Sequence, residues 1–192
     1  WEVGDGSAHP SLEVENGIIN NEWHLYTGTV NETGEGRVYR DGMLLGEGQL
    51  VIPANVLRTY NYIGKSNYAW DSLYQGYMDE VKIYNIAKTK DEIQRMYNER
   101  LEYRSNRIRS TANDGLVSYW NMDDDIDSPV LVDSVGGNDA TVTGTGPADG
   151  KINGGRWLIG EGVDAVIPHS DNLDLNVLTV SLWVNISFEF MA

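Results

Sequence analysis

The ten residues from Gly76 to Asn85 read GYMDEVKIYN and predict a long β-strand over residues 76–84. The segment is rich in β-branched and aromatic residues and begins at a glycine. These features are typical of a strand in a half-buried sheet. Residues 60–64, YNYIG, predict the strand before it. Short runs of this kind, separated by turn residues, extend back towards the first residue.

A β-hairpin is predicted in residues 37–45. Residues 37–40 (RVYR) and 43–45 (MLL) would pair across Asp41 and Gly42. An Asp-Gly pair tolerates the positive φ angles that a type I′ turn requires. Residues 22–30, EWHLYTGTV, alternate polar and bulky side chains and predict another strand.

One helix is predicted after residue 84. Thr89 and Glu92 have the spacing of a capping box, in which each residue bonds the backbone N–H of the other. Apolar residues follow at helical spacing and predict a stripe that packs on the sheet: Ile93, Met96, Tyr97 and Leu101. The pattern fades into residues 104–113, which we interpret as a linker.

Strand patterns resume after the linker. They cover residues 116–120, 140–143, 156–159, 165–167 and 178–184. Twenty-one glycines imply many tight turns, as expected of short antiparallel strands. A chain of 192 residues is long enough for one β-sandwich.

The motifs in these strands resemble the laminin-G-like jelly-roll family, which has the concanavalin A-like lectin/glucanase fold. Motifs typical of the family's C-terminal half are Trp23-His24, Tyr39-Arg40-Asp41-Gly42, Ile63-Gly64 and residues 76–85. Motifs typical of its N-terminal half are residues 115–120, 133–136, 150–151, 168–175 and 179–184. The resemblance implies an all-β fold, an antiparallel jelly-roll β-sandwich with one short helix.

The order of the two halves is reversed relative to the family. Residues 1–103 resemble its C-terminal half, and residues 114–192 resemble its N-terminal half. The chain is therefore a circular permutant, a fragment of a tandem array, or a subunit whose halves are completed between chains. Each half alone would expose a long sheet edge. We favour one permuted sandwich, and it predicts that the strand at 116–120 pairs with the strand at 76–84.

Composition excludes several classes of function. The formal net charge is −15, which argues against nucleic-acid binding because phosphate contacts need a basic surface. No apolar run of 18 residues is present, so no membrane-spanning segment is expected. Without cysteine, the chain forms no disulfide and no thiolate metal site. An acidic chain attracts cations.

Calcium is the cofactor that the sequence suggests, as a structural ion. Carboxylate and carbonyl oxygens are the ligands that calcium prefers, and members of the fold family often hold calcium near the rim of the sandwich. The residues predicted to bind it are Asp133, Asn138 and Asp139 in a glycine-rich turn, together with Asp79. Solvated surface charge is the alternative interpretation.

A glycan is the first candidate for a ligand. Aromatic rings stack on sugars and neighbouring polar groups bond their hydroxyls, which suggests a site at Tyr62, Tyr68, Trp70 and Asp71. The same side chains would otherwise pack a strand and a loop.

No catalytic residue is predicted. The string Glu-x-Asp-x-x-Glu of the fold's glycosidases is absent, which leaves a glycoside hydrolase as a weaker alternative. The chain is expected to be a non-catalytic binding module, extracellular or at the cell surface, whose ligand is a glycan or a protein. The alternative is a self-assembling structural subunit whose half-domains complete each other between copies.

Overall fold

The computed structural model describes residues 2–3, 10–54, 57–66, 74–101, 113–125, 128–159 and 162–187. The first part of the chain contains β1 (Trp23–Val30), β2 (Glu35–Arg40), β3 (Met43–Gln49), β4 (Tyr60–Ile63), β5 (Gly76–Tyr84) and α1 (Lys90–Leu101). The second part contains β6 (Leu116–Trp120), β7 (Val130–Leu131), β8 (Ala140–Thr143), β9 (Gly146–Asp149), β10 (Gly154–Leu158), β11 (Asp164–Pro168), η2 (Asp171–Leu173) and β12 (Leu178–Ile186).

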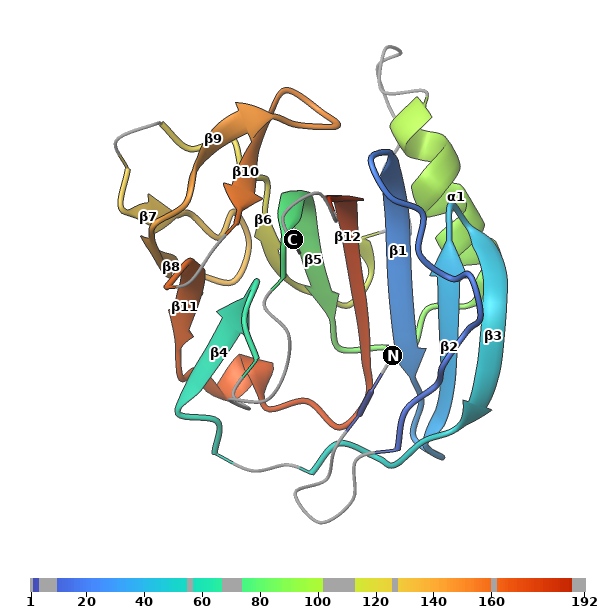
Figure 1. Cartoon of the computed structure of the whole chain (residues 1–192). Coiled ribbons are helices and arrows are strands. Elements are labelled where there is room, and N and C mark those ends of the chain that lie inside the picture. The colour runs from blue at the N-terminus through green and yellow to red at the C-terminus, as the bar shows by residue number, and fades with distance from the viewer. Residues whose placement is uncertain are drawn as a thin grey trace.

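The strands form two antiparallel sheets. The large sheet has the order β3-β2-β1-β12-β5-β10-β9, and β6 also pairs with β5 (Figure 1). The small sheet has the order β4-β11-β8-β7 and faces β5, β10 and β12. The predicted all-β sandwich with one short helix is confirmed.

Both parts of the chain contribute to the large sheet. β12 lies between β1 and β5 and pairs with both along their lengths. Val81 pairs with Trp120 and Lys82 with Tyr119, which confirms the predicted pairing of the strand at 116–120 with the strand at 76–84. Permutation itself and the division at residues 103 and 114 stay predictions. Most of the proposed linker lies outside the described residues.

The hairpin turn has the expected geometry. Asp41 and Gly42 have φ angles of 54° and 77°, and Arg40 pairs with Met43 directly across them. The positions of the other predicted strands are also confirmed to within a few residues. The short strands β7 and β9 are additional. Neither β9, with the sequence GPAD, nor the two-residue β7 has a sequence pattern typical of a strand.

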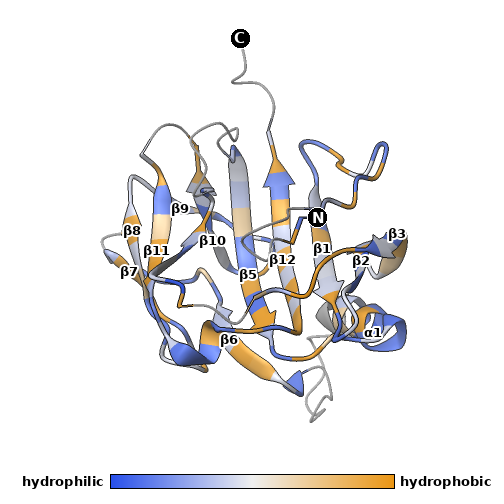
Figure 2. Cartoon of the chain, turned by 90° about the horizontal axis from the view of Figure 1, so that it is seen from below, coloured by the Kyte–Doolittle hydropathy of each residue, from blue (hydrophilic) through white to orange (hydrophobic). Residues whose placement is uncertain are grey.

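The main core lies between the two sheets. It contains buried side chains from both: Ile63, Ala165 and Ile167 of the small sheet and Met78, Val81, Trp120, Leu158 and Val184 of the large one. Hydrophobic segments, orange in Figure 2, lie on strands of both sheets. Among the tryptophans on strands, Trp120 and Trp183 are buried, whereas Trp23 and Trp157 are half-buried.

The helix packs on the other face of the large sheet. Ile93 and Met96 are buried against Tyr39 and Tyr84, while Tyr97 is half-buried with its ring centroid 5.9 Å from that of Trp183. The capping box is confirmed. The Thr89 backbone N–H donates to Glu92 Oε2 at 2.7 Å, and the Glu92 N–H donates to Thr89 Oγ1 at 3.3 Å.

Candidate functional site

A groove of about 720 Å³ lies between β4 and the inner face of β5 and β12. The residues of the large sheet that line it are Met78, Val81, Ile83, Val180 and Leu182. Arg58, Asn61, Ile63, Lys65 and Ile167 are among those that line the opposite side. A smaller cavity of about 110 Å³ shares Arg58, Asn61, Ile83 and Val180 with it and continues towards Leu173 and Leu178. The two cavities form one elongated channel along β12, which we call the groove.

The two faces of β12 have an unusual distribution of polarity. Val180 and Leu182 face the groove and are only half-buried. The alternate residues Thr179 and Ser181 lie on the helix side and are 0% and 2% exposed. Apolar side chains are normally the ones withdrawn from water. At these four positions the half-buried side chains are apolar and the buried ones are polar. Further along β12 the pattern ends, since Trp183 on the helix side and Val184 on the inner face are both buried.

Asn61 is the polar group inside the groove. It pairs with Ile167 across β4 and β11, so its side chain points to the same inner face as that core residue. Its Nδ2 is buried and has no hydrogen-bond partner among the described residues. A buried amide donor without an acceptor is costly, and such a group is a common marker of a ligand position.

Charged residues at the groove margin are held in place by carboxylates. Arg58 Nη1 lies 3.5 Å from Asp174 Oδ1, and its Nη2 donates to the carbonyl oxygen of Ala54 at 2.9 Å. Lys65 Nζ donates to Asp164 Oδ2 at 2.8 Å, and this bond raises the pKa of the exposed lysine. The groove therefore has an apolar floor and polar margins.

The residues predicted to bind a glycan are only partly described. Tyr62 contributes to the groove margin but pairs with Val166, so its side chain alternates to the outer face relative to Asn61. Lys65 Nζ lies 5.1 Å from the centroid of its ring. Tyr68, Trp70 and Asp71 lie outside the described residues.

Three of the four predicted calcium ligands meet in one turn. Asp133 accepts hydrogen bonds from the backbone N–H groups of Tyr119, Val135 and Asn138 at 2.8–3.0 Å. Asp139 Oδ1 accepts the N–H of Asp133 at 2.9 Å. Burial alone would raise the pKa of the Asp133 carboxyl, but the backbone donors more than offset it, so the pKa is lowered. This turn is stabilised by its own carboxylates.

Asp79, the fourth predicted ligand, lies at a different place. It is fully buried on β5, and its Oδ2 accepts the backbone N–H of Ile152 at 2.8 Å. Within the described part of the chain, Asp79, Asp133 and Asp139 do not form a group whose ligand atoms lie within 4.8 Å of one another.

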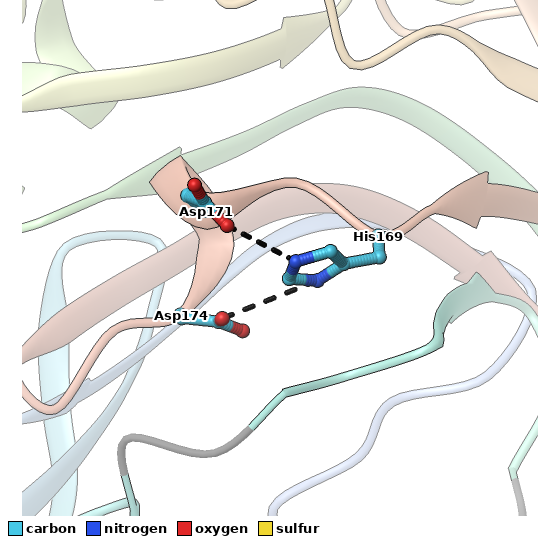
Figure 3. Close-up of side chains that lie close together, drawn as sticks. All are labelled: His169, Asp171 and Asp174. Carbon is cyan, nitrogen blue, oxygen red and sulfur yellow. Dashed lines mark hydrogen bonds and ion pairs between the residues drawn. The ribbon is translucent and has the colours of Figure 1, made fainter.

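A different group does so: His169, Asp171 and Asp174, which follow β11 (Figure 3). His169 Nε2 lies 3.1 Å from Asp171 Oδ1, and His169 Nδ1 lies 4.0 Å from Asp174 Oδ2. The side chains are 27%, 100% and 14% exposed, respectively. Sequence reasoning treated this corner as a family motif and missed the spacing His-x-Asp-x-x-Asp, which η2 folds into one cluster.

The family assignment agrees with this architecture. A sequence model of the concanavalin A-like lectin/glucanases superfamily matches residues 1–94. Residues 1–94 therefore resemble this superfamily. The resemblance predicted for the first part of the chain is thereby confirmed, and the superfamily's fold supports a binding module in general. No curated protein and no solved structure matches the chain.

No helix in the described ranges is long and apolar enough to cross a lipid bilayer.

Proposed function

We propose that this chain is a non-catalytic binding module that holds an extended polypeptide segment in the groove. One observation carries the proposal: Val180 and Leu182 of β12 face an open groove, while the polar residues Thr179 and Ser181 between and beside them are covered. Exposed apolar surface of this kind typically marks an interaction site. The match of residues 1–94 to the superfamily model agrees with a binding role.

An extended segment fits the position of the groove. β4 ends the described order of the small sheet, and the groove lies beside it, above β12. A partner strand placed there would add main-chain hydrogen bonds at the sheet edge, as in β-strand addition. Its alternate apolar side chains would cover Val180 and Leu182. The Nδ2 of Asn61 would donate to a main-chain carbonyl of the partner.

A glycan is a weaker candidate for the groove. Sugar recognition needs aromatic platforms and several polar side chains, whereas the floor described above is apolar and the polar lining residues lie on the opposite side and at the margin. The glycan set at Tyr62, Tyr68, Trp70 and Asp71 stays a prediction. Hydrolysis of glycosides requires two carboxylates, and the described lining residues include neither Asp nor Glu.

The partner segment comes either from another protein or from a second copy of this chain. The second case is the self-assembling subunit considered above, with half-domains completed between copies. Both agree with an extracellular or cell-surface location, where jelly-roll modules of this family commonly work. The structural calcium site predicted at Asp133, Asn138, Asp139 and Asp79 is part of the same proposal, with Asp139 as its exposed carboxylate.

The experiment is selection of a displayed random-peptide library on the intact chain. We expect selected peptides to alternate apolar and polar residues and to lose binding to Leu182→Asp, which places a charge on the groove floor. Val132→Asp is the matched control, because Val132 is 48% exposed, directly follows β7 and does not line the groove. Peptides that bind Leu182→Asp as well as the parent, or a library that yields none, would overturn the proposal. Light scattering of both variants separates self-association from binding to other proteins.

A further inference from the structure

The hydrogen bonds of His169 leave two electron-rich atoms facing each other. Nδ1 lies 3.0 Å from the backbone carbonyl oxygen of Arg58, an acceptor that only a protonated ring nitrogen can satisfy. The neutral ring then carries its lone pair on Nε2. That nitrogen lies 3.1 Å from Asp171 Oδ1, which is also an acceptor. A cation must lie between these two atoms, either a second proton on the ring or a metal ion.

The spacing of the two atoms suits a metal ion. Divalent zinc binds imidazole nitrogen and carboxylate oxygen at about 2.0–2.2 Å. Two such ligands at a right or tetrahedral angle are separated by about 3.0–3.4 Å, which includes the observed 3.1 Å. The bond from Nδ1–H to a main-chain carbonyl is the arrangement that orients metal-binding histidines in many proteins.

A third ligand is within reach. Three atoms, one each from His169, Asp171 and Asp174, lie within 4.8 Å of one another, and Asp174 Oδ2 lies 4.0 Å from His169 Nδ1. Asp174 also lies 3.5 Å from Arg58 Nη1, and the Arg58 carbonyl holds the histidine ring. Asp174 is therefore a positioning residue that could move into the coordination shell. Asp171 is exposed, so water can complete the coordination shell.

We propose that His169 Nε2 and Asp171 bind a divalent transition-metal ion of the zinc class, with Asp174 and Arg58 positioning the histidine ring. The nitrogen ligand distinguishes this site from a calcium site, because calcium takes oxygen ligands. The net charge of −15 raises the local concentration of cations. The proposal does not depend on what occupies the groove.

His24 provides a comparison within the same chain. Its Nδ1 lies 2.6 Å from Asp41 Oδ2, so the protonated ring nitrogen and the carboxylate form an ordinary hydrogen bond. His24 Nε2 lies 3.6 Å from Glu22 Oε2, beyond hydrogen-bond distance. His24→Asn is therefore the matched control for His169→Asn. Asparagine at position 169 keeps a donor for the Arg58 carbonyl and removes Nε2.

The experiment is calorimetric titration of the full chain with zinc chloride and with calcium chloride, together with imidazole ¹⁵N spectra at neutral pH. We expect one zinc site, weakened more than about tenfold by His169→Asn or Asp171→Asn and unchanged by His24→Asn. We expect the Nε2 resonance of His169 to move on addition of zinc. Equal zinc affinity of His169→Asn and the parent would overturn the proposal. So would spectra in which both ring nitrogens carry protons and zinc alters neither.

Discussion

The hydroxyl oxygens of Thr27 and Ser181 lie 3.1 Å apart in the buried layer beneath the helix, although the two residues are 154 positions apart in the sequence. They face each other across β1 and β12. Thr179, two residues earlier on β12, accepts the N–H of Lys88 and donates to the carbonyl of Ile86. Hydroxyl pairs thus join the two parts of the chain and the segment that leads into the helix.

Removal of one of these hydroxyls leaves the other buried without its partner. We expect Thr27→Ala and Ser181→Ala each to lower the free energy of unfolding by about 1–3 kcal/mol. The double variant should lose less than the sum of the two, since the remaining orphan is also removed. Urea denaturation of the four proteins measures this coupling, with Thr143→Ala as an exposed control. If the change in free energy of unfolding of the double variant equals the sum of the two single changes, the two hydroxyls are not directly bonded.

The helix is expected to be structural. Ile93 is 0% exposed, so Ile93→Ala should leave a cavity and lower the free energy of unfolding by about 2–5 kcal/mol. Arg95→Ala, on the exposed side of the same helix, should change it by less than about 1 kcal/mol. Thermal melting of the two variants distinguishes a packed helix from an appendage. An Ile93→Ala protein as stable as the parent would identify an appendage.

Asp133 should make stability depend on pH in the acid range. Its folded-state pKa is lowered from the ordinary 3.8, so the charged form stabilises the fold. That contribution is fully present above the unfolded-state pKa and is lost as pH falls through the folded-state value. The difference in free energy of unfolding between the parent and Asp133→Asn should therefore be largest near neutral pH and shrink below 3.8. A difference that is constant across this range would show that the carboxylate charge is irrelevant.

Calcium should act through Asp139 if the proposed structural ion is present. An ion at 100 times its Kd stabilises a protein by about 2.7 kcal/mol, so chelation should lower the Tm of the parent. Asp139→Asn should remove this response, whereas His169→Asn should retain it. An identical Tm in calcium and in chelator would contradict the proposed ion. The backbone hydrogen bonds to Asp133 would then account for the stability of the turn.

Local sequence patterns account for most of the fold. The Asp41-Gly42 turn, the Thr89–Glu92 capping box and the long strand at 76–84 are each determined by residues close in the sequence, and the structure agrees with them. β9 could not be predicted in this way. Gly146 has no side chain to contribute to a pattern, and it pairs with Trp157 only because β10 lies beside it.

The candidate sites were harder to predict because they also depend on contacts between segments that are distant in the sequence. Acidic residues near Asp133 suggested a metal, yet their carboxylates accept backbone N–H groups that become available only once the turn has formed. His169 becomes a candidate ligand because the Arg58 carbonyl, from a distant segment, accepts its Nδ1–H. The groove depends on which face of β12 the helix covers, and no residue on β12 alone determines that.

The central place of β12 has a consequence for synthesis. Ribosomes make β1 and β5 well before β12, yet in the large sheet these two strands meet only through it. Until β12 is synthesised, β1 and β5 each have an unpaired edge, and its backbone N–H and C=O groups can pair with a strand of another chain. Pairings this distant also close slowly, and partly made β-proteins of this kind are prone to aggregate. We therefore expect the growing chain to require a chaperone that shields β1 and β5 until translation reaches Ile186.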